Sequence, residues 1–117
     1  MTTQIDGYHA HIYYENDEER AIAAEIREHV DSHYNVVMGR WRDEPVGPHP
    51  VAMYQIAFSN DLFDTLIPWL MLNRRSLNIL IHPNTSDMVA DHRDFPIWLG
   101  DKLDLNIAFL EAGNTRA

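Results

Sequence analysis

Polar and apolar residues alternate along residues 8–14, in the run YHAHIYY, and this pattern predicts a first strand. A helix is expected next, because Asn16 is a favourable N-cap and Glu19 completes a capping box. Apolar residues then recur at helical spacing to about His33. Similar runs predict strands at residues 35–41, 51–58 and 77–82.

A second helix is predicted after the third strand, with Ser59 or Asn60 as its cap and apolar residues up to Leu70. Pro68 lies inside this pattern, so a kink or a break is expected there. Residues 42–50 contain three prolines and one glycine and are expected to form a shaped loop. Residues 96–99 are expected to be a short helical piece, and the structure of residues 103–110 stays open.

The resulting order, β-α-β-β-α-β, predicts an α+β protein of the ferredoxin-like type. This fold has a four-stranded antiparallel sheet in the order 4-1-3-2, with both helices on one face. The chain of 117 residues has no internal repeat or linker, so residues 1–117 are expected to form one domain.

Strand alternation places several histidines on one face of this sheet. Ala10 and Ile12 suit packing beneath the helices, so His9, His11 and Tyr13 are expected on the opposite face. His82 ends the fourth strand, which runs antiparallel to the first, and should therefore lie near His9. His49 precedes the third strand and is expected near His11 and Tyr13. This convergence predicts a metal or acid–base site, since imidazole is a common ligand that titrates near neutral pH.

Other residues are weaker candidates for this site. His92, which lies near Asp87, Asp91 and Asp94 in the sequence, is a fifth histidine that a site of this kind can use. Tyr13, Tyr54 and Arg74 can orient an anionic or phenolic substrate, although aromatic packing for the tyrosines and solvated charge for the arginine are slightly favoured. His29 and His33 are interpreted as residues of a helix boundary. Acidic residues are absent from the predicted histidine face, so either a loop acid completes the site (Asp43, Glu44 or Asp91) or the site is all-histidine.

Composition removes several classes of function. The chain has no cysteine, which excludes disulfides, thiolate zinc sites, iron–sulfur clusters and cysteine nucleophiles. A net charge of −9 disfavours nucleic-acid binding, which relies on clustered Lys and Arg. Neither a membrane-spanning run nor a signal pattern in residues 1–6 is evident, so a soluble cytoplasmic protein with no membrane partner is expected.

With these residues in view, the chain resembles the DOPA 4,5-dioxygenase family. The resemblance extends from Tyr8 to about Leu105, and it is carried by YHAHIYY at 8–14, GRW at 39–41, PVGPHP at 45–50, MYQIAF at 53–58, PWLMLNR at 68–74, HPNT at 82–85, DH at 91–92 and WLG at 98–100. It implies a ferredoxin-like domain, often dimeric, in which a non-haem metal and dioxygen open a catechol ring.

The leading hypothesis is therefore an extradiol dioxygenase in which His9, His11 and His82 hold Fe(II), with Zn or Mn as alternative metals. His49 or His92 acts as general base and then as general acid, and Arg74 meets a substrate carboxylate. The roles of the five histidines are interchangeable at this point. Two alternatives stay open. One is a zinc or manganese hydrolase or isomerase. The other is a non-catalytic module that dimerises by stacking uncovered sheet faces.

Overall fold

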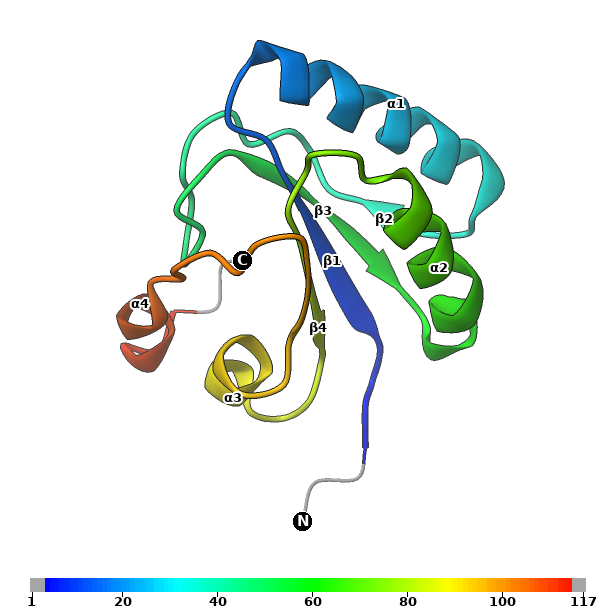
Figure 1. Cartoon of the computed structure of the whole chain (residues 1–117). Coiled ribbons are helices and arrows are strands. Elements are labelled where there is room, and N and C mark those ends of the chain that lie inside the picture. The colour runs from blue at the N-terminus through cyan, green and yellow to red at the C-terminus, as the bar shows by residue number, and fades with distance from the viewer. Residues whose placement is uncertain (1–3, 115–117) are drawn as a thin grey trace.

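The computed structural model describes residues 4–114, and these form an α+β structure around one antiparallel sheet (Figure 1). The first three and last three residues of the predicted domain lie outside the described part. Along the chain the elements are β1 (Tyr8–Tyr13), α1 (Asp17–His33), β2 (Val37–Met38), β3 (Met53–Phe58), a short 3₁₀ turn (Asn60–Leu62), α2 (Phe63–Asn73), β4 (Ile79–Pro83), α3 (Met88–Arg93), β5 (Ile97–Leu99) and α4 (Ile107–Glu111).

The sheet has five strands in the order β2-β3-β1-β4-β5, and every neighbouring pair is antiparallel. The first four strands therefore follow the predicted order, with β1 between β3 and β4. The predicted number of four strands is wrong, because residues 97–99 form a strand where a short helix was expected. Ile97 pairs with Ile81 and Leu99 with Ile79, so the free edge of β4 determines this conformation.

Helix α1 begins as the sequence predicts. The side chain of Asn16 accepts a hydrogen bond from the backbone N–H of Glu19 at 2.9 Å. The Glu19 carboxylate accepts a bond from the N–H of Glu15, one residue before the expected partner. Helix α2 continues through Pro68 as one helix, so the predicted break does not occur. Pro68 is exposed, and so is Asp64, whose carbonyl loses its helical hydrogen bond and can be hydrated instead.

The main core lies between α1, α2 and one face of the sheet. Its fully buried members include Ala10 and Ile12 from β1, which confirms the predicted orientation of this strand. Figure 1 shows α1 and α2 on this side of the sheet and α3 and α4 on the other. The two predicted helices therefore share one face as expected, whereas α3 and α4, which were not predicted, lie on the other.

The second face of the sheet is covered as well. Tyr13, Met53 and Leu80 form a smaller buried cluster there, and it is packed against Val46, Val51, Trp98, Leu103 and Leu105. The backbone N–H of Asn106 donates to the carbonyl of Pro48 at 2.8 Å and joins the two covering segments. Within residues 4–114, the second face of the sheet is thus not left uncovered as expected. A dimer formed by stacking two uncovered sheet faces therefore loses its structural basis.

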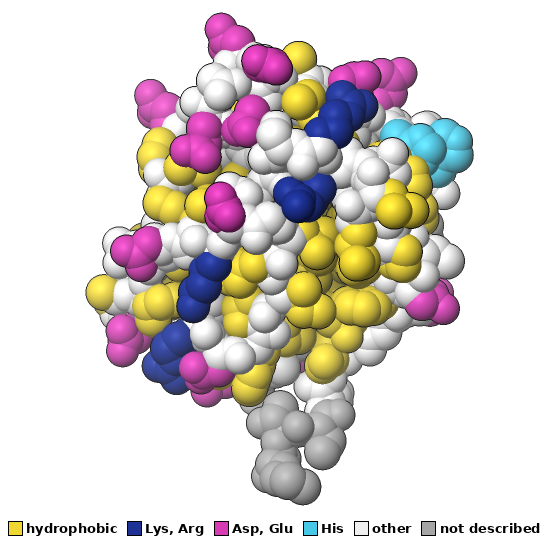
Figure 2. All heavy atoms as spheres, in the orientation of Figure 1, with side chains coloured by type: hydrophobic (Ala, Val, Ile, Leu, Met, Phe, Trp, Pro, Cys, Tyr) yellow, Lys and Arg dark blue, Asp and Glu magenta, His cyan; other side chains and the backbone are white. Residues whose placement is uncertain are grey.

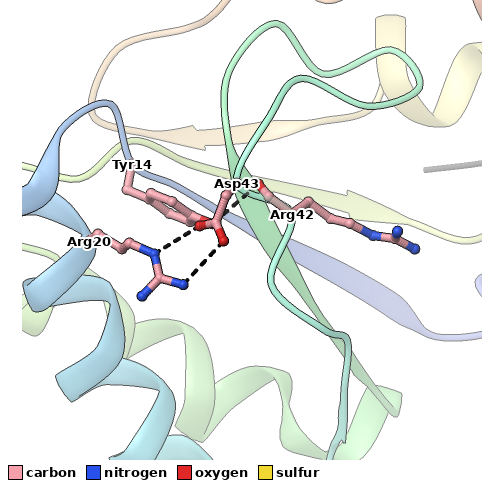
Figure 3. Close-up of polar contacts among 4 residues, drawn as sticks. All are labelled: Tyr14, Arg20, Arg42 and Asp43. Carbon is pink, nitrogen blue, oxygen red and sulfur yellow. Dashed lines mark hydrogen bonds and ion pairs between the residues drawn. The ribbon is translucent and has the colours of Figure 1, made fainter.

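The loop at residues 42–50 is fixed at its start by a group of polar contacts (Figure 3). The Tyr14 hydroxyl donates to Asp43 at 2.8 Å and reaches the carbonyl of Arg42 at 3.2 Å. Arg20 on α1 pairs with the Asp43 carboxylate at 2.8 Å. This group therefore ties the loop that carries His49 to the first helix.

Within residues 4–114, no helix is long and apolar enough to cross a membrane.

Replacing the cap residue tests the local stability of α1. We expect Asn16→Ala to lower the free energy of unfolding by about 1 kcal/mol, because the N–H of Glu19 loses its acceptor. Urea unfolding followed by circular dichroism measures this change. Asn35→Ala, at an exposed position outside the helices, is the control and should leave stability nearly unchanged. Equal losses in both variants would contradict the capping role.

Candidate metal centre

Five histidines meet between the second face of the sheet and its cover. His9 and His11 come from β1, and His82 on β4 is the direct antiparallel partner of His9. His49 enters from the loop at 42–50 and His92 from α3. The ring centroids lie 4.1 Å apart for His82 and His92, 4.2 Å for His11 and His49, and 5.1 Å for His9 and His82. The structure thus brings together the four histidines that were predicted to converge (His9, His11, His49 and His82) and places His92 beside them.

Three of these histidines form a group that could hold a metal ion. His9, His11 and His82 each offer a ring nitrogen, and these atoms lie within 4.8 Å of one another. Nε2 of His11 lies 3.1 Å from Nε2 of His82. His11 and His82 are buried, while His9 is partly buried. Imidazole donors suit divalent transition metals such as iron and zinc.

The hydrogen bonds of the cluster leave several nitrogens free for a ligand. Nδ1 of His9, Nδ1 of His11, Nε2 of His49 and Nε2 of His92 are buried without a partner among residues 4–114. Native structures seldom leave buried polar atoms unpaired, and such atoms are frequent where a ligand or an ion belongs. The residues present therefore fit a bound metal ion and a polar substrate.

Backbone carbonyls orient two of the rings. Nδ1 of His82 lies 2.9 Å from the carbonyl oxygen of Pro83, and Nδ1 of His92 lies 2.8 Å from that of Met88. A carbonyl only accepts hydrogen bonds, so each Nδ1 carries the proton and each Nε2 presents a lone pair. Histidines that bind metals typically donate their other ring N–H to a carbonyl or carboxylate in this way.

Burial keeps all five imidazoles neutral near pH 7. It lowers the pKa of His9 to about 4 and the pKa of both His49 and His82 to about 3, and neighbouring histidines add to the effect. The pKa of His11 is lowered well below its usual value, first by burial and then by four other histidines. Burial also lowers the pKa of His92. Neutral imidazole is the form that binds a cation.

Tyr13 adjoins the histidines at the other end of the cluster. Its hydroxyl lies 2.7 Å from Nδ1 of His49, and its ring stacks on that of Trp98 with centroids 6.1 Å apart. Burial raises the pKa of Tyr13 above its usual value. A neutral phenol is therefore part of the site.

Carboxylates stay outside the histidine group within the described part of the chain. Asp91 is buried, but its oxygens accept hydrogen bonds from the backbone N–H and the hydroxyl of Thr85. Asp43 pairs with Arg20, and Glu44 is exposed in its loop. Of the two possibilities left open by the sequence, the structure favours the all-histidine donor set.

Two predicted substrate-binding residues lie away from the histidines. Tyr54 faces the helices, where it is fully buried and its hydroxyl donates to the carbonyl of Ala23 at 2.7 Å. Alternation along β3 directs it away from the face of Gln55, which pairs with His11. Arg74 follows α2, and its guanidinium donates to the carbonyl of Leu77 at 3.1 Å. His29 and His33 stack on each other on α1, with centroids 4.0 Å apart.

A pocket of about 120 Å³ adjoins His92 and was missed by the sequence analysis. Its lining combines apolar and charged side chains: His92, Arg93, Trp98, Lys102, Leu103, Asp104, Leu105 and Ile107. Arg93 is paired with Asp94, whereas Lys102 is exposed at the rim. Lys102 is the single lysine of a chain with a net charge of −9, and this isolation was the one sequence feature that could have indicated the pocket.

The lowered pKa values predict that the metal-free protein loses stability in mild acid. The unfolded chain binds protons on these histidines below pH ~6.5, whereas the folded chain resists them until about pH 4 or 3. Stability is therefore full above pH ~6.5 and falls below it, by up to about 1.4 kcal/mol per pH unit for each such histidine.

Urea unfolding in EDTA between pH 7.5 and 5 measures this slope. We expect His92→Asn to reduce it, whereas Asn35→Ala, a non-titrating change at an exposed position, should leave it intact. A wild-type stability that does not change over this range would contradict the assignment of neutral buried imidazoles.

Comparison with known proteins is consistent with this geometry. The family model described as the Dopa 4,5-dioxygenase family matches residues 8–109. A protein from Amanita muscaria named DOPA 4,5-dioxygenase is 33% identical over 118 residues, covering 94% of this chain and 52% of its own length. An uncharacterised 21.2 kDa protein from Botryotinia fuckeliana is 35% identical over 115 residues, covering 89% of this chain and 63% of its own length. The chain thus spans between half and two thirds of these curated relatives.

A crystal structure from Nostoc punctiforme, described as a "putative dioxygenase", has the same fold. Its TM-score is 0.91 and its sequence identity is 49%, with 94% of this chain and 95% of that chain covered. The family match extends over most of the chain and includes all five clustered histidines. The chain belongs to the DOPA 4,5-dioxygenase family.

Proposed function

We propose that this protein is a metal-dependent extradiol dioxygenase that opens the ring of a catechol, such as DOPA or a related aromatic, with O₂. The observation that carries the proposal is the buried group His9, His11 and His82, with two further histidines beside it. Family membership supports the reaction class.

The three histidines are the proposed ligands, with Fe(II) as the expected metal and Zn or Mn as alternatives. When bound, Fe(II) would hold the catechol oxygens and supply the redox chemistry that activation of O₂ requires. Neutral imidazoles are suited to that role, and the Nε2 atoms of His11 and His82, which lie 3.1 Å apart, are close enough to bind one cation. His9, partly exposed at the end of the group, is the ligand nearest to solvent.

His92 is the proposed general base. Its Nδ1 hydrogen is held by the carbonyl of Met88, so the lone pair of its buried Nε2 is free to take a proton from a catechol hydroxyl. The same nitrogen can return that proton to the product, which makes His92 the general acid as well. His92 also lines the pocket beside the metal group, where a substrate would enter.

The pocket suits a planar aromatic with an anionic substituent. Trp98, Leu103 and Leu105 provide apolar surface for a ring, and Lys102 provides a cation at the rim. Lys102 thus takes over the role of carboxylate partner that the sequence analysis gave to Arg74, whose guanidinium contacts backbone carbonyls. A net charge of −9 makes such a cationic rim a selective feature for an anionic group.

Three further assignments stay proposals. The strand order β2-β3-β1-β4 and the two long helices on one face support a ferredoxin-like fold. Figure 2 shows apolar side chains gathered between α2 and α3, and exposed apolar residues on or near these elements include Leu72, Phe95 and Ile97. This exposed apolar surface supports a homodimer, and it replaces the earlier argument from stacked, uncovered sheet faces. A cytoplasmic location remains an expectation from the sequence.

A zinc-dependent hydrolase or isomerase is the second candidate. The all-histidine donor set favours it, because three histidines also form catalytic zinc sites, whereas iron oxygenases commonly add a carboxylate. Oxygen dependence separates the two functions.

Oxygen uptake tests the leading proposal. After anaerobic loading with Fe(II), we expect O₂ consumption and a yellow product with at least one of L-DOPA, caffeate and protocatechuate. His11→Ala and His82→Ala should each abolish both signals with the fold intact, because each removes a ligand of the proposed group. His33→Ala, at an exposed position on α1, is the control. Wild-type activity in both ligand variants would exclude the proposed site.

Lys102 is expected to set the preference for anionic substrates. Lys102→Gln should raise the KM for carboxylate-bearing catechols on the order of 5-fold, equivalent to about 1 kcal/mol for an exposed ion pair. The KM for unsubstituted catechol should stay the same, and Lys102→Arg should retain the preference. Steady-state kinetics with both substrates measures this. An equal rise for unsubstituted catechol would show that Lys102 acts on the pocket and not on the charge.

A further inference from the structure

Tyr13 and His49 form an isolated hydrogen-bonded pair at the edge of the histidine cluster. The Tyr13 hydroxyl lies 2.7 Å from Nδ1 of His49, and both side chains are buried. Among residues 4–114, this hydroxyl forms no other hydrogen bond, and Nε2 of His49 forms none. The His49 ring packs against that of His11, with centroids 4.2 Å apart. The pair therefore reaches the proposed metal group through His49.

The hydrogen bond determines which nitrogen of His49 carries the proton. A phenol has one hydrogen to donate, and Nδ1 of His49 is the acceptor within reach. If Nδ1 were protonated, the hydroxyl hydrogen would be buried without an acceptor, at a cost that makes this arrangement unfavourable. The hydroxyl therefore donates to Nδ1, and the neutral ring holds its own hydrogen on Nε2.

The neighbouring rings hold the opposite tautomer. His82 and His92 donate from Nδ1 to the carbonyls of Pro83 and Met88, so their Nε2 atoms present lone pairs. His82 and His92 thus accept at Nε2, whereas His49 donates at Nε2. Acceptors suit a metal ligand and a general base, whereas a donor suits neither role.

We propose that Tyr13 is a positioning residue that holds His49 as an Nε2–H donor, and that His49 stabilises negative charge that develops on a substrate oxygen. The tautomer follows from the hydrogen bonds alone, whereas the action on substrate rests on the proposed dioxygenase function. His49 keeps its proton throughout, so no proton has to leave Tyr13. Preorganised donors of this kind stabilise transition states without a proton transfer. Acid–base work then belongs to His92, and metal binding to His9, His11 and His82.

Nitrogen NMR measures the tautomers directly, without substrate. In protein with ¹⁵N-labelled histidine, metal-free and loaded with Zn²⁺, two-bond ¹H–¹⁵N correlations identify the protonated nitrogen of each ring. We expect His49, assigned by its loss in His49→Gln, to be protonated at Nε2, and His82 and His92 at Nδ1. Tyr13→Phe should shift His49 towards the Nδ1–H form. Tyr54→Phe is the matched control, because it removes an equally buried hydroxyl with an equally short 2.7 Å bond on the opposite face.

Kinetics of the loaded enzyme give the second readout. His49→Ala should lower kcat by roughly 100-fold, the usual effect of removing one such donor, with KM and metal stoichiometry unchanged. Tyr13→Phe should lower kcat less than His49→Ala does, and Tyr54→Phe should leave it unchanged.

The outcomes separate this inference from the proposed function. An Nδ1–H signal for His49 in the wild type, or no response to Tyr13→Phe, overturns the inference even if catechols are cleaved. Loss of bound metal in His49→Ala also overturns it, because His49 would then be a ligand. The expected tautomers without oxygen uptake on any catechol uphold the positioning role of Tyr13 and remove the dioxygenase proposal instead.

Discussion

The antiparallel pairing of β1 with β4 is the constraint on which the site depends. It sets His9 directly opposite His82 and brings His11 to within 3.1 Å of the same ring. Ala10 and Ile12 are fully buried beneath the helices, so a slip of one residue would direct histidines into the apolar core. The core on one face therefore determines the position of the histidines on the other. A central strand with neighbours on both sides is a rigid support for such a group.

The arrangement is costly for the isolated chain. Four buried ring nitrogens lack partners, and each unsatisfied buried polar atom typically costs about 1–3 kcal/mol. The rings cannot escape this cost by taking up protons at neutral pH, because burial and the other imidazoles lower their pKa values. A bound cation would give unpaired imidazole lone pairs a partner without adding a proton. The unpaired ring nitrogens thus lower the stability of the chain without a bound ion, which is a common property of binding sites.

Local patterns predicted the part of the site that lies on regular strands. Alternation along β1 and the antiparallel run of β4 were enough to place His9, His11 and His82, because both are properties of short segments. Residues 97–99 could not be placed in this way, since their strand exists through the free edge of β4. Tyr54 was a candidate because its orientation depends on the register between β3 and β1, which the sequence does not show. The role of Leu103 and Leu105 as cover lies in a segment without periodicity.

The cover over the second face separates two tasks within the site. The three histidines that could hold a metal lie on the central strands β1 and β4, whereas His49, His92, Trp98 and Lys102 come from the loop at 42–50, from α3, and from the edge strand β5 and the chain after it. Contacts that do not involve these three histidines hold the surrounding segments, among them the bond from Asn106 to Pro48 and the Tyr14–Asp43 contact. Loops of this kind vary more readily than the strands beneath them. Under the proposed function, changes in the cover can therefore alter the substrate preference, while the histidine group that fits a metal stays in place.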